Sequence, residues 1–415
     1  MARIVLKFGG TSVGDTDLIK NVARKVKAET QRGNEVAVVV SAMSGATNQL
    51  VKWVNEIAPL HDPREYDVVV ATGEQVTIGL LAMALQQEGV KSRSWVSWQM
   101  PSKTDSAYAK ARILEIDTTK MAKSMAAGEV PIVPGFQGVS PEGRITTLGR
   151  GGSDTSAVAL AAALKADRCD IYTDVDGVYT TDPRIVDKAK KIDRVTYEEM
   201  LEMASQGSKV LQTRSVELAM NHHVRVQVLS SFDAALGSDL PGTLVVDEEE
   251  IMAQGLEKSV VSGIAFSRDE AKITVTRVAD RPGIAAAIFG PLADTNINVD
   301  MIVQNVSLDG SSTDITFTVP RADLARAVER LEKAKADLKF AEIKSDTKVA
   351  KISVIGVGMR SHAGVALKMF ETLAAKGINI QVISTSEIKV SVLVADEYTE
   401  LAVRALHTAY ELDAA

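Results

Sequence analysis

Residues 145–164, ITTLGRGGSDTSAVALAAAL, combine residue types suited to holding an anion. A short β-prone segment leads into a loop with three glycines, and an alanine- and leucine-rich helix is predicted directly after it. Glycines let backbone N–H groups approach a ligand closely, and a helix N-terminus carries partial positive charge. Arg150 adds a full positive charge and Asp154 a negative one. The stretch therefore predicts an anion site that also contains a carboxylate, Asp154.

A second candidate is Lys7 in KFGG (7–10), where a predicted strand ends and Gly9 and Gly10 let the chain turn beneath a ligand. A lysine in this place can neutralise a phosphate as a point charge. Taken alone, KFGG is explained equally well by a solvated lysine at a strand end. Asp154 alone is explained by the preference of carboxylates for the first turn of a helix.

Composition limits the class of protein. With 415 residues, the chain is expected to form two or three domains. A net charge of -7 argues against a nucleic-acid partner, and the single Cys169 excludes an internal disulfide and a cysteine-rich metal site. Neither a bilayer-spanning apolar run nor the apolar core of a signal peptide is predicted. We therefore expect a cytoplasmic protein without a membrane partner.

Strand-like and helical stretches alternate over the first 230 residues, which indicates a mainly parallel sheet covered on both faces. In such sheets, ligands gather at the carboxyl ends of the strands. A Thr196/Glu199 capping box opens one of the helices, at 196–206. The other expected elements are strands at 4–10, 35–45, 130–138, 169–177 and 224–231, and a helix at 73–89.

The C-terminal third contains a repeat. Residues 273–302 match 352–383 as a strand, a glycine-bearing turn, an amphipathic helix and the start of a second strand. Each copy continues into another strand and another helix, which gives a βαββαβ plan. A poorly periodic, acidic stretch at about 232–261 is predicted to be a linker.

One motif in the second copy imitates a dinucleotide site. VIGVGMRS (354–361) resembles the start of a glycine fingerprint, but Ser361 occupies the third glycine position and no acidic residue follows at the required distance. A phosphate loop ending in G-K-[ST] is also absent. Nicotinamide binding is therefore not expected.

Five motifs together resemble the aspartate kinase branch of the amino-acid kinase family: KFGGTSVG (7–14), VVVSAMSGATN (38–48), ATGEQ (71–75), TTLGRGGSDTSA (146–157) and TDVDGVYTTDPR (173–184). The resemblance extends through GSKVL (207–211) and both C-terminal copies, which resemble ACT domains. It implies an α/β fold: a three-layer αβα amino-acid kinase domain with a mainly parallel sheet, followed by two ferredoxin-like βαββαβ ACT modules. The implied boundaries are 1–231 for the catalytic domain, 232–261 for the linker, and 262–345 and 346–415 for the modules.

The reaction implied by the resemblance is ATP-dependent phosphorylation of the side-chain carboxylate of L-aspartate. The product is 4-phospho-L-aspartate, and the step opens lysine, threonine and methionine biosynthesis. A carboxylate is already ionised at pH 7 and needs no general base, so catalysis rests on positioning and charge neutralisation. The resemblance makes Lys7 and Asp154 catalytic. It assigns aspartate binding to Ser41, Thr47, Glu74, Arg150, Gly151, Gly152 and Ser153.

Arg150 is expected to hold a substrate carboxylate in a bidentate fork, while Glu74 pairs with the substrate ammonium. A glutamate in the first turn of a helix is also simply favourable to the helix dipole. The zwitterionic substrate would thus explain why one loop region carries both signs of charge.

The nucleotide is expected to be ATP with Mg²⁺, with no metal site built by the protein itself.

One position departs from the family pattern: Gln212 and Thr213 stand where many relatives carry His-Pro, which loosens the correspondence at the helix expected to start near Lys209. Taken singly, DVDG and TTDPR are turn sequences with solvated aspartates. The ATP contacts implied are Lys7, Phe8, Gly9, Gly10, Thr173, Asp174, Tyr179, Asp182, Arg184 and Lys209.

The paired modules imply feedback regulation by lysine, threonine or both, and assembly of a homo-oligomer. Internal Met252 raises the further possibility of a separate regulatory subunit that starts there. The alternative explanation of RPG (281–283) is a tight turn in modules that only dimerise. The effector contacts implied are Asp280, Gly283, Ile284, Ala285, Asn298, Val299, Gln304, Val365, Ala366, Asn379, Ile380 and Ser386.

Two other functions stay open at this point. Kinases of glutamate, acetylglutamate, carbamate and nucleoside monophosphates share the implied fold, so the acceptor can differ. An amino-acid sensor whose kinase half has lost activity belongs to another class, but Lys7, Arg150, Asp154 and Lys209 are all present and argue against it.

Overall fold

The computed structural model describes residues 2–100, 102–233, 236, 241–252, 260–306 and 312–413. The chain forms two compact units. The first comprises Met1–Val178, Lys191–Ala204 and Lys209–Leu256; the second comprises Tyr179–Lys190, Ser205–Ser208 and Glu257–Ala415.

The first unit is built on a sheet that contains eight strands among the described residues, in the order β10-β12-β11-β9-β1-β2-β6-β3. Every neighbouring pair is parallel except β11 and β12, which confirms the predicted mainly parallel sheet. The strands are β1 (Arg3–Phe8), β2 (Glu35–Val40), β3 (Ser92–Ser94), β6 (Val130–Pro134), β9 (Arg168–Thr173), β10 (Arg194–Thr196), β11 (Val226–Ser230) and β12 (Thr243–Val246).

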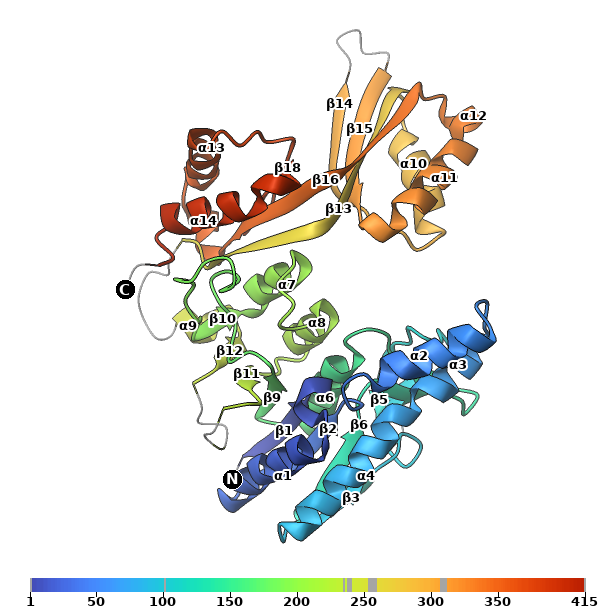
Figure 1. Ribbon diagram of the computed structural model, residues 1–415, viewed down its shortest axis with the longest axis vertical. Helices are drawn as coiled ribbons and strands as arrows, with labels where there is room; N and C mark the ends of the chain where they lie inside the picture. The colour runs from blue at the N-terminus through green and yellow to red at the C-terminus, as the bar shows by residue number, and fades with distance from the viewer. Residues whose placement is uncertain are drawn as a thin grey trace. The chain divides into compact units, whose positions relative to one another are not determined.

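Helices cover both faces of this sheet, as the three-layer prediction requires (Figure 1). On one face, α1 and α4 pack side by side on alternate residues of β1 and β2. On the other face, α6 contacts β1, β2 and β9. The helices of the unit are α1 (Thr16–Gln31), α2 (Ala46–Ile57), α3 (Pro63–Val70), α4 (Thr72–Gln87), α5 (Thr119–Ala126), α6 (Gly152–Leu164), α7 (Tyr197–Ser205), α8 (Thr213–Asn221) and α9 (Glu248–Met252).

A small second sheet with the order β5-β4-β7-β8 leads into the glycine-rich loop. Its last strand ends at Thr147, one residue before that loop begins. The strands are β4 (Ser102–Thr104), β5 (Ile113–Ile116), β7 (Gln137–Val139) and β8 (Ile145–Thr147).

Local sequence signals are confirmed at several elements. The Thr196 hydroxyl accepts the Glu199 N–H at 3.1 Å, and the Glu199 carboxylate accepts the Thr196 N–H at 3.1 Å, so the predicted capping box opens α7. The stretch 232–261, predicted to be a linker, contains β12, which pairs with β10 and β11. The sheet of the first unit thus continues past residue 231. Residues 234–235, 237–240 and 253–259 of that stretch lie outside the described residues.

The helical stretch Pro63–Gln87, made of α3 and α4, is long and apolar enough to cross a membrane by length and composition alone. The sequence was expected to contain no such run. Half of its most apolar window is buried inside the protein, and Ile78, Leu81 and Leu85 pack against the sheet. Core helices of globular proteins pass the same test, so the stretch is weak support for a membrane span.

The second unit has one continuous sheet, in the order β14-β15-β13-β16-β18-β17 among its described strands. Two long strands, β13 (Gly263–Ala279) and β16 (Glu342–Ile355), run antiparallel through its middle. The other elements are α10 (Ile284–Ala293), β14 (Asp300–Val306), β15 (Ser312–Val319), α11 (Leu324–Lys333), α12 (Lys335–Leu338), α13 (Val365–Ala375), β17 (Val382–Thr385), β18 (Lys389–Ala395) and α14 (Thr399–Ala409).

Two hydrophobic cores show where the two βαββαβ modules lie. One core joins the later part of β13 to α10 and α11. The other joins Ile264 at the start of β13 to the later part of β16, to β18 and to α13 and α14. The second module therefore takes one strand, near Gly263–Ser267, from chain that precedes the first module. The predicted boundary between residues 345 and 346 falls inside β16.

Candidate active site

The central feature of the candidate site is an ion pair between Lys7 and Asp154. Nζ of Lys7 lies 2.5 Å from Oδ1 of Asp154, and each side chain is only about a tenth exposed. Strand geometry explains the contact. Side chains of β1 alternate, so Ile4, Leu6 and Phe8 point to the core beneath α1 and α4, and Lys7 points to the face covered by α6. Asp154 stands in the first turn of α6. The sequence-predicted catalytic pair is thus brought together.

The glycine loop positions the N-terminus of α6 beside Lys7. Gly149 and Gly151 have φ of +77° and +73°, a left-handed conformation that favours glycine. Gly151 caps α6 without a side-chain hydrogen bond, so the first N–H groups of the helix have no side-chain cap. The N–H of Gly152 donates to the Gly149 carbonyl at 3.0 Å, and the amides that follow it in the first turn suit an anion.

A further glycine lets this helix approach the sheet. A Cβ on Gly135 would lie 2.6 Å from Cβ of Ser153, which no side chain could tolerate. The close approach allows Oγ of Ser41, just after β2, to donate to Oγ of Ser153 at 2.9 Å. Two predicted substrate contacts from distant parts of the chain therefore meet beside the anion site.

Glu74 is a buried carboxylate in the first turn of α4 and is only 3% exposed. Its Oε1 accepts the N–H of Ala42 at 3.1 Å, whereas Oε2 has no hydrogen-bond partner among the described residues. The nearby Gln137 amide donates to the Ala71 carbonyl, and its hydrogen bonding offsets a small part of the effect of burial on the pKa of Glu74. Burial raises the pKa of Glu74 to about 7. A buried acceptor without a partner suits a cationic group of a ligand.

Among the other predicted residues of the first unit, Phe8 is fully buried in the hydrophobic core, whereas the following residues are more exposed. Thr47 is half-buried in the first turn of α2, and Arg150 projects from the glycine loop. Thr173 donates from its hydroxyl to Asp174 at 3.1 Å where β9 ends. Lys209 is exposed in the loop between α7 and α8, so the prediction that it opens a helix is wrong: α8 begins at Thr213, with Gln212 as its N-cap.

Tyr179, Asp182 and Arg184 belong to the second unit. Arg184 forms a fork on the carboxylate of Asp182, with Nη2 at 2.7 Å from Oδ2. Their segment is held inside that unit, because the Thr180 carbonyl accepts the N–H of Ile264 at 2.7 Å and the Thr180 hydroxyl lies 2.9 Å from Nε2 of His407. Nothing in the local sequence TTDPR signals this attachment.

The predicted effector residues lie at equivalent places in the two modules. Gly283 and Gly364 have φ of +87° and +96° and precede the first residues of α10 and α13. Asp280, Asn298 and Gln304 are exposed, and Gln304 lies on β14. The other predicted contacts are at the first turn of α10 (Ile284, Ala285), before β14 (Val299), at the first turn of α13 (Val365, Ala366), before β17 (Asn379, Ile380) and after β17 (Ser386).

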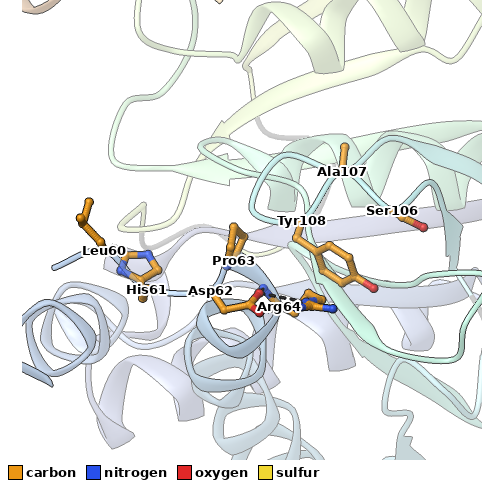
Figure 2. Close-up of a pocket in the computed structure, with 8 residues that line it drawn as sticks. All are labelled: Leu60, His61, Asp62, Pro63, Arg64, Ser106, Ala107 and Tyr108. Carbon is orange, nitrogen blue, oxygen red and sulfur yellow. Dashed lines mark hydrogen bonds and ion pairs between the residues drawn. The ribbon is translucent and has the colours of Figure 1, made fainter. Parts of the chain in front are cut away.

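An open hollow of about 580 Å³ lies elsewhere on the first unit (Figure 2). Leu60 to Arg64, at the start of α3, line one side, and Ser106 to Tyr108 line the other. None of these residues is a predicted site residue. Asp62 and Arg64, which carry the charges in this hollow, are already paired with each other. The geometry of Lys7, Glu74 and Asp154 is therefore the better guide to chemistry.

No group of three or more His, Cys, Asp or Glu side chains that could hold a metal is found among the described residues. Kinases usually bind Mg²⁺ through one or two carboxylates and the phosphates of the nucleotide, without a protein cage. The donor set fits that mode, with Asp154 as the carboxylate beside the anion site.

Comparison with known proteins defines the class. The amino acid kinase family model matches residues 2–230, and two ACT domain models match residues 272–336 and 352–410. The chain belongs to the amino acid kinase family.

Its full-length relatives include aspartokinases. That of Pseudomonas aeruginosa is 58% identical over 415 residues, covering 100% of this chain and 98% of the relative. That of Helicobacter pylori is 46% identical over 410 residues, covering 99% of both. Among solved structures, E. coli aspartokinase III in complex with aspartate and ADP has a TM-score of 0.81 at 28% identity, covering 98% of this chain and 99% of the other.

Proposed function

We propose that this chain transfers the γ-phosphoryl group of ATP to the side-chain carboxylate of L-aspartate. The observation that carries the proposal is the buried Lys7–Asp154 pair beside the N-terminus of α6. Relatives named aspartokinase that match the full length support the choice of acceptor. The E. coli neighbour was solved with aspartate and ADP, the acceptor and the spent donor of this reaction.

Each charged group of the site has a distinct role in the transfer. The attacking carboxylate is already ionised and loses no proton, so the protein must position it and neutralise charge on the transferring group. Lys7 supplies a point charge, and the first N–H groups of α6 supply oriented dipoles. Asp154 holds the Lys7 ammonium in place.

Acceptor recognition uses the polar groups around α4 and the glycine loop. Arg150 takes a substrate carboxylate in a fork, and Glu74 accepts the substrate ammonium through its free oxygen. Hydroxyls of Ser41, Ser153 and Thr47 complete the polar lining. On the nucleotide side, Thr173, Asp174 and Lys209 of the first unit contact ATP. Asp154 and the phosphates would hold Mg²⁺, which would supply further neutralisation of the phosphate charge.

The experiment that tests this function is a panel of acceptors in a coupled assay for ADP release. Aspartate, glutamate, acetylglutamate, carbamate and a nucleoside monophosphate are each supplied with ATP and Mg²⁺, and acyl phosphate is trapped with hydroxylamine. Turnover with aspartate alone supports the proposal. Turnover with another acceptor, or binding of amino acids without any turnover, contradicts it.

A pH prediction follows from Glu74. Its pKa is raised to about 7, so the carboxylate is protonated below that pH and loses its attraction for the substrate ammonium, which stays charged. We expect the KM for aspartate to rise roughly tenfold as pH falls from 8 to 6, since one pH unit below a pKa is a factor of ten. Initial rates at fixed ATP measure this.

The matched control for that prediction is Glu74→Gln. It removes the titrating group but keeps the shape, so the KM for aspartate should be high and independent of pH over the same range. Equal pH profiles for the wild type and the variant would show that another group titrates.

We propose further that the second unit binds lysine, threonine or both, and that the chain works as a homo-oligomer in the cytoplasm. Support comes from the two ACT domains and from the E. coli neighbour, which was also solved with lysine and aspartate in a T-state, at a TM-score of 0.73 and 28% identity. The left-handed glycines before α10 and α13 open a helix N-terminus to a carboxylate in each module. A separate regulatory subunit starting near Met252 would contain both modules.

Gln304→Ala is expected to relieve this inhibition. Gln304 is exposed on β14, and its amide can bond an amino-acid ligand. Loss of a coupling of about 1–3 kcal/mol, the usual size between two sites, would raise the half-inhibitory effector concentration by roughly 5- to 150-fold. Rates at sub-saturating aspartate are measured against lysine and threonine. The control is Asn305→Ala, its exposed neighbour on the other side of the strand. Full sensitivity of the Gln304 variant would remove this residue from the effector site.

A further inference from the structure

The loop at residues 148–151 needs contacts with other elements to keep a single conformation. Two of its residues are glycines in the left-handed region, and glycine loses more conformational freedom on ordering than any other residue. The same loop carries Arg150 and leads directly into Ser153 and Asp154. A small displacement of the loop would therefore move several groups of the site together.

Arg214, in the first turn of α8, forms hydrogen bonds with this loop and with the segment beside it. Its Nη1 donates to the Leu148 carbonyl at 3.1 Å, and its Nη2 donates to the Ala111 carbonyl at 2.9 Å. The N–H of Ala111 in turn donates to the Thr147 carbonyl at 2.9 Å. One guanidinium thus ties the first residue of the loop to the neighbouring segment. Its planar fork is suited to two carbonyls at once, whereas a lysine could bond only one with similar geometry.

Gln212, the N-cap of α8, covers the other end of the loop. The position that a Cβ would take on Gly151 is 1.9 Å from Cγ of Gln212. The side chain of Gln212 therefore lies directly on the backbone of Gly151. The start of α8 contacts the loop at two points, through a hydrogen bond at Leu148 and through packing at Gly151.

Asp67 of α3 holds the approach to the loop from a different element. This fully buried carboxylate accepts the N–H of Thr147 at 2.9 Å, the hydroxyl of Thr147 at 2.6 Å and the N–H of Ala109 at 3.0 Å. The Asp67 carboxylate thus binds the donors of Thr147 just before the loop, and the Arg214 guanidinium binds the Leu148 carbonyl at its start.

We propose that Arg214 is a positioning residue for acceptor binding: it acts through the Leu148 carbonyl to set the place of Arg150 and of the first turn of α6. Arg214 itself need not touch the substrate. The assignment of an acceptor to Arg150 rests on the function proposed above, whereas the hold on the loop rests on the hydrogen bonds alone.

The test compares Arg214→Met, Arg214→Lys and the control Arg112→Met. Arg112 is an exposed arginine next to Ala111 whose positive charge acts on Arg214, so this variant controls for loss of a nearby charge without loss of the Arg214 hydrogen bonds. In Arg214→Met we expect the KM for aspartate to rise on the order of tenfold to a hundredfold, the size of effect that a misplacement of about 1 Å can have. The KM for ATP should change much less. Arg214→Lys should fall between the wild type and the methionine variant, and Arg112→Met should match the wild type.

Hydrogen exchange of the amides in 148–152, measured on the free full-length protein, gives a readout that needs no substrate. It should accelerate in Arg214→Met and stay unchanged in Arg112→Met. Unchanged exchange in a folded Arg214→Met protein would overturn the proposal, as would equal losses for aspartate and ATP. If exchange accelerates but the wild type does not phosphorylate aspartate, the hold on the loop stands and the proposed acceptor is wrong.

Discussion

Lys7→Met is expected to lower kcat on the order of a thousandfold, which corresponds to about 4 kcal/mol of transition-state stabilisation. The side chain is buried at the end of β1, and the bulk of methionine fills most of its space, so the fold should persist. What is lost is the positive charge beside the N-terminus of α6. Initial rates at saturating ATP and aspartate measure the effect.

The control for this prediction is Lys20→Met, which removes an exposed lysine of α1 that pairs with the exposed Asp17. It should leave kcat unchanged, because exposed pairs contribute little. A Lys7 variant with near-normal turnover and a normal thermal transition would take Lys7 out of the mechanism.

Asp154→Asn is the second large effect, with kcat expected to fall on the order of a hundredfold. Asparagine keeps the shape but removes the charge that lies 2.5 Å from the Lys7 ammonium. Lys7 is then free to adopt other positions, so fewer enzyme molecules present it to the transferring group.

The double variant decides whether the two residues act as a unit. If Asp154 works only by holding Lys7, the double variant should lose little more than Lys7→Met alone, because effects within a unit are not additive. Losses that multiply would show that Asp154 has an independent part in the reaction.

Continuous apolar runs that alternate with helical stretches, together with a capping box, sufficed to predict much of the first unit. The apolar, β-branched runs became β1, β2, β6, β9 and β11, and the Thr196/Glu199 box opened α7. The catalytic roles of Lys7 and Asp154 came from the family resemblance, because each residue alone is explained by an ordinary position at a strand end or in the first turn of a helix.

Features that depend on non-local contacts could not be predicted. The pKa of Glu74 depends on its burial in the folded protein, and TGEQ alone shows only a glutamate in a first turn. Arg214 and Asp67 look like ordinary helix residues in the sequence, although one bonds a carbonyl 66 positions away and the other a residue 80 positions away. The short TLVV of β12 has no periodicity that separates it from a linker.

The strand at Gly263–Ser267, which completes the second module from ahead of the first, has a consequence for cutting the chain. In order of sequence, the first module is an insertion within the second. A protease that cleaved near residue 345 would therefore not release the C-terminal half as an intact domain, because Ile264 and its partners would stay on the other fragment and leave part of the hydrophobic core uncovered. A fragment that begins at Met252, by contrast, keeps that strand and both modules in one piece of chain.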